Sequence, residues 1–190
     1  SNPDLEWEKT AQTDIGLDFG LFNNRLNGEI DYYIKNTTDL LLDVPVPSTS
    51  GYNTITRNIG AIENRGIEIV LNSNNLVGDF TWNTSFNIAF NRNEVKELAE
   101  GQTIIDPGSS RNMNVVKVGE PIGVFFGAEY AGVDPDNGDA LWYVNKEGRE
   151  RETTNDFSEA EFVVLGNPNP DFIGGLTNNF GYKGFTLDIT

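Results

Sequence analysis

The sequence predicts an all-β chain, a fragment of a large antiparallel transmembrane β-barrel of the outer-membrane type with long irregular outer loops. Over residues 80–91, large or apolar side chains at even positions alternate strictly with small or polar ones, as in a strand with two unlike faces. This stretch rises roughly 28 Å at a tilt of about 40°, close to the apolar band of about 25 Å in such barrels. Short turns also alternate with long loops along the chain.

The composition argues against several classes of function. With 13 basic and 29 acidic residues the net charge is -16, which disfavours a nucleic-acid partner held through phosphates. The absence of Cys and His removes disulfides, thiolate nucleophiles and the commonest general base and metal ligand. No run approaches 18 apolar residues, so no transmembrane helix is expected. We expect no cofactor, no metal and no enzymatic activity.

Barrel hairpins are predicted over residues 1–95. The first pairs strands at about 13–22 and 25–38 through a two-residue turn at Asn23-Asn24, because Asn tolerates the positive φ of hairpin turns. Prolines then break the pattern, so residues 40–60 are expected to form an outer loop rather than an inner strand. Strands at about 64–73 and 79–93 follow with the same alternation.

The second half of the chain is less regular. Residues 96–170 are rich in Gly, Pro, Asn and Asp and are expected to form a long outer-loop region with a small β-hairpin near 122–145. Residues 171–190 then resume the alternation, which predicts a further, truncated barrel hairpin.

Alternation assigns side chains to two environments. The residues expected to face lipid are Ile15, Leu17, Phe19, Phe80, Trp82, Phe86, Ile88 and Phe90. Those expected to line the lumen are Asp14, Asp18, Glu29, Asp31, Glu68 and Asn87. Trp82, Tyr32 and Tyr182 suit the aromatic girdles at the membrane interface. The alternative is a soluble, secreted β-sandwich that is either carbohydrate-binding or adhesive. Strands of a sandwich also have one apolar face, which packs in the core.

The outer-loop region carries the candidate chemistry. Phe125, Tyr130, Trp142 and Tyr143, with Phe126, are candidates for stacking on sugar rings, although packing of the small hairpin against the barrel rim or a partner lid is favoured. Asp134–Asp139 resembles a calcium loop, but Gly138 stands at the fifth position and Asn145 at the twelfth, so a plain turn is favoured. The pairs Glu159/Glu161 and Asp134/Asp139 are weak as glycosidase carboxylates, because pairs arise by chance among 29 acids.

Eight short motifs spread along nearly the whole chain resemble one family, the SusC/RagA-like TonB-dependent outer-membrane transporters. They are Trp7–Thr10, Ile15–Leu26, Asp31–Tyr33, Thr38–Leu42, Pro45–Pro47, Asn58–Glu68, Phe86–Asn91 and Gly166–Pro170, the last standing before the hairpin 172–185. Each motif alone is only a strand or a turn, but together they are specific.

The resemblance implies a plugged barrel of about 22 strands in the outer membrane of a Gram-negative bacterium, of which this chain is a late portion. It implies import of glycans, oligosaccharides or peptides. The implied partners are a SusD-like surface lipoprotein acting as a lid and the TonB complex, which acts through segments absent from this chain. The plug also lies outside the sequence, so no residue here is assigned to the energised step.

Overall fold

The computed structural model describes residues 5–45, 54–58, 60–98, 103–105 and 114–190. The chain divides into two compact units. The sheet unit takes in Leu5–Leu41, Asn58–Asn93 and Pro170–Thr190. The loop unit takes in Leu42–Arg57 and Glu94–Asn169.

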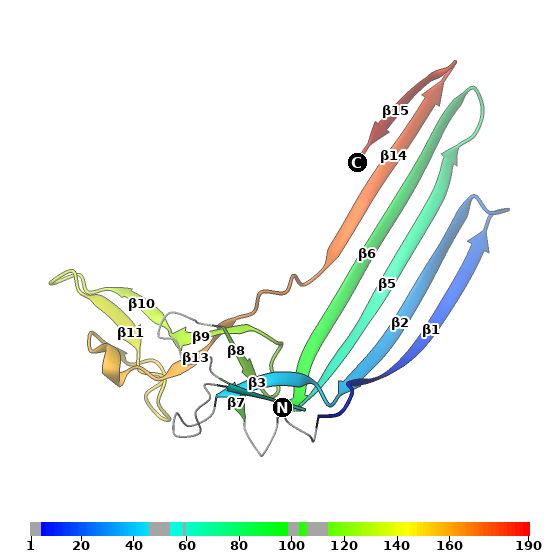
Figure 1. Cartoon of the computed structure of the whole chain (residues 1–190). Helices are drawn as coiled ribbons and strands as arrows, with labels where there is room; N and C mark the ends of the chain where they lie inside the picture. Colours follow the sequence, from blue (N-terminus) through cyan, green and yellow to red (C-terminus); the bar gives the residue numbers. More distant parts are fainter. Residues whose placement is uncertain (1–4, 46–53, 59, 99–102, 106–113) are drawn as a thin grey trace. The chain divides into compact units, whose positions relative to one another are not determined.

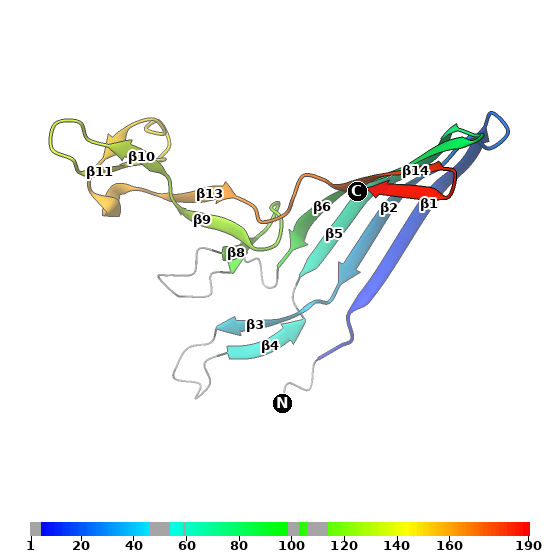
Figure 2. The ribbon, with the colours of Figure 1, turned by 90° about the horizontal axis from the view of Figure 1, so that it is seen from above.

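The sheet unit is built on one six-stranded antiparallel sheet in the order β1-β2-β5-β6-β14-β15. The strands are β1 (Lys9–Leu21), β2 (Leu26–Thr38), β5 (Ala61–Leu76), β6 (Phe80–Glu97), β14 (Ile173–Tyr182) and β15 (Phe185–Ile189). They lie side by side in a single layer (Figures 1 and 2). The predicted all-β antiparallel fold is confirmed, and β1, β5 and β6 extend beyond their predicted ends.

Short turns join the strands at one end of the sheet (Figure 1). Lys183 and Gly184, with φ of 47° and 88°, form a two-residue turn between β14 and β15. The turn predicted at Asn23-Asn24 is longer, since Leu21 pairs with Leu26 and Phe22–Arg25 all lie in the turn. The longer turn lets Arg25 bind the next hairpin, donating to the Asn74 carbonyl at 3.2 Å and the Asn75 carbonyl at 2.7 Å.

Two long insertions leave the other end of the sheet, between β2 and β5 and between β6 and β14. The first contains β3 (Leu41–Pro45) and β4 (Thr54–Asn58), which form a two-stranded sheet where a loop was predicted. Proline does exclude an inner strand, but in a two-stranded sheet each strand is paired on one side only. The missing N–H of Pro45 is therefore tolerated.

The second insertion forms two small sheets. One has the order β13-β9-β8-β7, from β13 (Phe162–Gly166), β9 (Val124–Ala128), β8 (Asn114–Lys117) and β7 (Ile104–Ile105). The other has β10 (Tyr130–Val133), β11 (Ala140–Tyr143) and β12 (Thr153–Thr154), and the 3-10 helix η3 (Phe157–Glu159) precedes β13. The hairpin expected near 122–145 is therefore reduced to β10 and β11. The segment before it pairs with β13 instead, which packs Phe126 against Phe162 at 6.1 Å between ring centroids.

The buried core belongs to the loop unit. Among the described residues, the buried hydrophobic side chains are Val95, Leu98, Val115, Val124, Val144 and Ala160. Large apolar side chains of the sheet remain exposed, for example Ile15 at 68% and Leu17 at 61%. The sheet is thus not organised around a core of its own, unlike a sheet of a soluble sandwich.

Candidate functional site

The strand register gives the sheet two chemically distinct faces. Ile15 pairs with Tyr32 and Tyr32 with Ile67, so these residues share one side, which we call the apolar face. Gly16, Asp31 and Glu68 are aligned in the same way on the opposite side, the polar face.

Hydrogen bonds extend both faces onto β6. On the apolar face, Asn75 Nδ2 donates to Thr84 Oγ1 at 2.7 Å. On the polar face, Asn93 Nδ2 donates to Asn64 Oδ1 at 3.0 Å. Even positions of β6 therefore continue the apolar face, and register carries this face on to β14 and β15.

All eight side chains expected to face lipid lie on the apolar face. Ile15, Leu17 and Phe19 come from β1, and the other five from β6. Trp82 stacks on Phe180 of β14, with 5.8 Å between ring centroids. Two strands that are distant in the sequence thus form one aromatic surface.

All six side chains expected to line the lumen lie on the polar face. Asp31 stands opposite Glu68, and Asp18 stands opposite Glu29. Asp14 lies on the same face of β1, and Asn87 occupies it on β6 opposite Gly175. Five carboxylates thus form an electronegative strip across β1, β2 and β5.

A shallow depression lies beside the acidic strip. Its volume is about 250 Å³, and its polar lining comes from Asp18, Asn27, Glu29 and Asn72, with Phe19, Gly28 and Val70 completing it. Within the described part of the chain, no group of three or more acidic side chains has the arrangement of a metal site. The polar face therefore presents hydrogen-bond acceptors and negative charge.

One bridge across the polar face was missed from the sequence. Tyr33 on β2 lies over Gly66 on β5, and its hydroxyl donates to Asn91 Oδ1 on β6 at 2.9 Å. A Cβ on Gly66 would stand 2.7 Å from the Tyr33 hydroxyl oxygen and 2.4 Å from the Phe90 carbonyl oxygen. Alternation places all three positions on the polar face, but their contact depends on the register of three strands.

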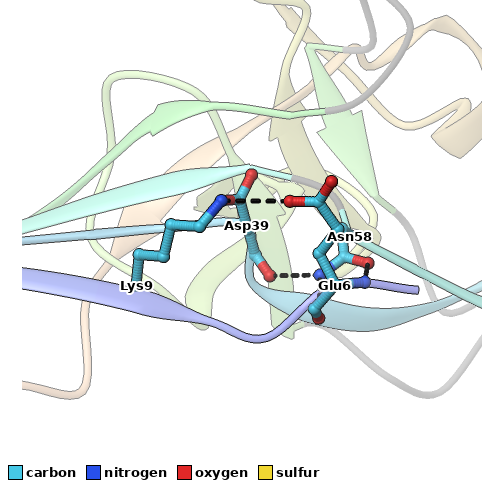
Figure 3. A network of polar contacts seen from close by, with 4 residues as sticks. All are labelled: Glu6, Lys9, Asp39 and Asn58. Carbon is cyan, nitrogen blue, oxygen red and sulfur yellow. Dashed lines mark hydrogen bonds and ion pairs between the residues drawn. The ribbon is translucent and has the colours of Figure 1, made fainter. Parts of the chain in front are cut away.

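The end of the sheet that carries the insertions is held by a polar network (Figure 3). Asn58 Oδ1 accepts from the Glu6 backbone N–H at 2.7 Å, and Asn58 Nδ2 donates to the carbonyls of Glu6 at 2.8 Å and Asp39 at 2.7 Å. Lys9 Nζ lies 3.0 Å from carboxylate oxygens of both Glu6 and Asp39. The network ties the segment before β1 to the bases of β3 and β4.

The four aromatic side chains proposed to contact substrate do not gather at one place. Tyr130 and Trp142 are paired across β10 and β11, whereas Phe125 belongs to the other small sheet. Trp142 packs edge-on against Phe157 at 5.2 Å between ring centroids. Tyr143 has the guanidinium of Arg151 over its ring at 5.5 Å. Tyr130 remains the most exposed of the four, at 59%.

The turn at Asp134–Asp139 is held by hydrogen bonds among its own residues, and Asp139 Oδ2 also accepts from Asn155 Nδ2 at 3.2 Å. The Asp134 N–H donates to the Asp139 carbonyl at 2.8 Å, and the Asp134 carboxylate accepts from the Asp136 N–H at 2.9 Å. Asn137 Oδ1 accepts from the Asp139 N–H at 2.8 Å. These contacts are those of a side-chain-stabilised hairpin turn.

Two exposed carboxylates of the loop unit have lowered pKa values. Asp156 caps the start of η3, and the hydrogen bonds that its carboxylate accepts from the hydroxyl and backbone N–H of Ser158 lower its pKa. Backbone N–H groups of Glu150 itself and Gly148 lower the pKa of Glu150. In both cases the hydrogen bonds favour the charged carboxylate, and the same hydrogen bonds hold the local turn.

Among the described residues, no helix has the length and apolar content needed to cross a membrane. The whole chain, residues 1–190, matches the family described as TonB dependent receptor-like, beta-barrel. It is 37% identical over its full length to TonB-dependent receptor P3 of Formosa agariphila, and it covers 20% of that protein. It is 34% identical, again over its full length, to TonB-dependent receptor SusC of Bacteroides thetaiotaomicron, of which it covers 19%.

Solved structures agree with these relatives. A chain from the structure of the RagAB peptide transporter superposes with a TM-score of 0.88 and 34% identity, over 98% of this chain and 21% of that one. A chain from the RagAB peptide importer in its 'open-open' state superposes with a TM-score of 0.87. The chain spans about a fifth of the length of the relatives that it matches. It belongs to the β-barrel of the TonB-dependent receptors, in their SusC-like branch.

Proposed function

We propose that this chain forms part of the barrel wall of an outer-membrane importer, with its apolar face in lipid and its polar face toward the solute path. The segregation of the two faces across all six strands carries the proposal. A barrel wall has lipid on one side and an aqueous interior on the other, so this pattern fits it without any further layer. A sandwich sheet would need a second sheet on its apolar face.

The proposed cargo is a glycan or oligosaccharide, with a peptide as the second candidate. SusC stands among the relatives, and the RagAB neighbours are described as peptide transporters. The polar face offers carboxylates, amides and hydroxyls, which suit sugar hydroxyls and peptide amides alike. In the described strands β1, β2 and β5, Lys35 is the only basic residue on this face, so polyanionic cargo is disfavoured.

The proposed partners are a SusD-like surface lipoprotein over the insertion end of the sheet and the TonB complex, acting through segments outside this chain. Import would proceed by binding, plug movement and release, with no bond broken. The aromatic side chains Phe125, Tyr130, Trp142 and Tyr143 stay candidates for cargo or lid contact.

The experiment uses the full-length receptor that carries this segment, tagged and extracted in mild detergent. We expect a surface lipoprotein to co-purify, and the complex to retain a fluorescent neutral oligosaccharide or a short peptide. A sulfated oligosaccharide of equal length serves as the charge control and should be retained less. Failure to retain either neutral sugar or peptide, with no co-purifying lipoprotein, would contradict the proposal.

A further inference from the structure

Near the short-turn end of the sheet, the apolar face carries a group of polar side chains. Ser73 and Asn75 on β5, Trp82 and Thr84 on β6, and Asn178 on β14 form what we call the interfacial cluster. Ser73 Oγ donates to Asn75 Oδ1 at 2.9 Å, and Asn75 Nδ2 donates to Thr84 Oγ1 at 2.7 Å. Thr84 Oγ1 in turn donates to Asn178 Oδ1 at 2.7 Å.

Trp82 fixes the orientation of the Asn178 amide. The indole Nε1 can only donate, and it lies 3.0 Å from Asn178 Oδ1, so that atom must be the oxygen. The oxygen therefore accepts two hydrogen bonds, and Nδ2 points elsewhere. Within the described residues, Nδ2 of this half-buried side chain has no protein acceptor. Two unpaired N–H groups would be costly in hydrocarbon, but lipid ester and phosphate oxygens can accept them.

On the apolar face, large hydrophobic side chains follow the cluster along each strand toward the insertion end of the sheet. On β6 these are Phe86, Ile88 and Phe90, and the next residue on this face is Arg92. From Thr84 to Arg92 the strand rises about 27 Å, or about 21 Å along the membrane normal at a tilt near 40°. That height is close to the apolar band of about 25 Å of outer-membrane barrels. On the other side of the cluster lie the rings of Phe80 and Phe180, 6.3 Å apart.

We propose that the interfacial cluster contacts phospholipid headgroups at the short-turn end of the sheet and so sets the depth of the sheet in the bilayer. The inference rests on the proposed function, because it requires the apolar face to lie in lipid. The inference locates the boundary between hydrocarbon and headgroups. Asn178 and its partners lie at this boundary, and the aromatic rings beyond them lie among the headgroups.

The test measures depth without disturbing the cluster. The full-length receptor, reconstituted in phosphatidylethanolamine and phosphatidylglycerol vesicles, carries one nitroxide at a time on a cysteine replacing Ile189, Leu176 or Ile88. Ile189 pairs with Asn178 and is 52% exposed, so its label reports the level of the cluster. Thr177→Cys on the polar face is the matched control. Heat-dependent gel mobility establishes that each variant is folded.

Power saturation with oxygen and a water-soluble nickel complex gives the depth of each label. We expect the Ile189 label at the headgroup level, the Leu176 label about 5 Å deeper and the Ile88 label about 10 Å deeper. The Thr177 label should be reached by nickel.

Two other results would overturn the inference, and they are distinguishable. A label at Ile189 that lies as deep as the one at Ile88 places the boundary elsewhere and leaves the proposed function standing. A label at Ile88 that nickel reaches as readily as Thr177 shows that the apolar face is not in lipid, and the proposed function then fails as well.

Discussion

Gly66 shows how the absence of one side chain determines the position of another. The Tyr33 ring occupies the space over Gly66, and its hydroxyl reaches Asn91 on the strand beyond. Gly28 has the same role on the apolar face, where a Cβ would stand 2.8 Å from Phe19 Cζ and 2.7 Å from Leu71 Cδ2. Each glycine therefore lets a large side chain lie flat against the sheet, which keeps that part of the surface smooth.

Gly66→Ala is expected to destabilise the full-length receptor by roughly 1–3 kcal/mol, the usual cost of overpacking. The new methyl group would meet the Phe90 carbonyl, which cannot move without disturbing the ladder. Denaturant unfolding in detergent measures the loss. Gly166→Ala is the control, because a Cβ added at Gly166 would lie 3.9 Å from the nearest atom, Phe125 Cδ2, which is an ordinary van der Waals contact. Equal denaturant midpoints for the Gly66→Ala and Gly166→Ala receptors would show that a methyl group at Gly66 is accommodated without cost.

At this scale the sequence predicts the face of a residue but not its partner. Alternation assigns Asp14, Glu29 and Phe86 to a face, because the strand period of two is a local property. The contact of Tyr33 with Asn91 joins residues 58 positions apart. It depends on the register of β5 between them, which local sequence does not specify. The bonds of the interfacial cluster were missed for the same reason.

In the proposed barrel wall, the strands are the elements that separate lipid from water. Phe86→Lys on β6 is expected to destabilise the fold, by less than the roughly 2–4 kcal/mol that a lysine costs at the bilayer midplane, because Phe86 pairs with Leu176 near the edge of the apolar band. Asn87→Lys, one residue further on the opposite face, should change stability little. Equilibrium folding of the full-length receptor into phospholipid vesicles compares the two variants. A Phe86→Lys protein as stable as Asn87→Lys would mean that the face assignment is incorrect.

The network around Asn58 holds the base of the first insertion. Asn58→Asp keeps an acceptor for the Glu6 N–H but loses both donated bonds, each worth about 0.5–1.5 kcal/mol. We expect faster hydrogen exchange at Glu6 and at Leu41, whose N–H donates to Glu8 nearby.

Asn137→Asp is the matched control for this substitution. Among the described residues, the Asn137 side chain makes one hydrogen bond, which it accepts from the Asp139 N–H, and a carboxylate accepts this bond equally well. Exchange that stays slow at Glu6 in the Asn58→Asp receptor would show that Lys9 and its two carboxylates hold the segment without Asn58.

Elements with a clear period were predictable, whereas the pairing of several short strands in the loop unit was not. The six strands of the main sheet show alternation over five or more residues, which signals both their existence and their faces. β9 and β13 have five residues each and pair across an interval of more than 30 positions. Their pairing follows from burial of Val124 and from contact between Phe126 and Phe162, not from a local pattern.

The whole chain presents a broad apolar face and a 13-residue strand, β1, bonded on one side only. In water, such a surface and such an edge favour association between copies. We expect the isolated 190-residue chain to aggregate in water and to recover β-structure only in detergent micelles. Circular dichroism and light scattering during dilution of the detergent measure both. A monodisperse monomer that melts cooperatively in water would instead support a soluble fold.

Both long insertions leave the same end of the sheet, while the opposite end has only short turns. Lengthening a flexible insertion costs only about 0.6 kcal/mol for each doubling of its length, and it does not alter the pairing of the strands. A residue added within a strand would shift every later side chain to the other face. Changes of sequence and length can therefore accumulate in the insertions at one end, while the pairing of the strands keeps the register of the sheet.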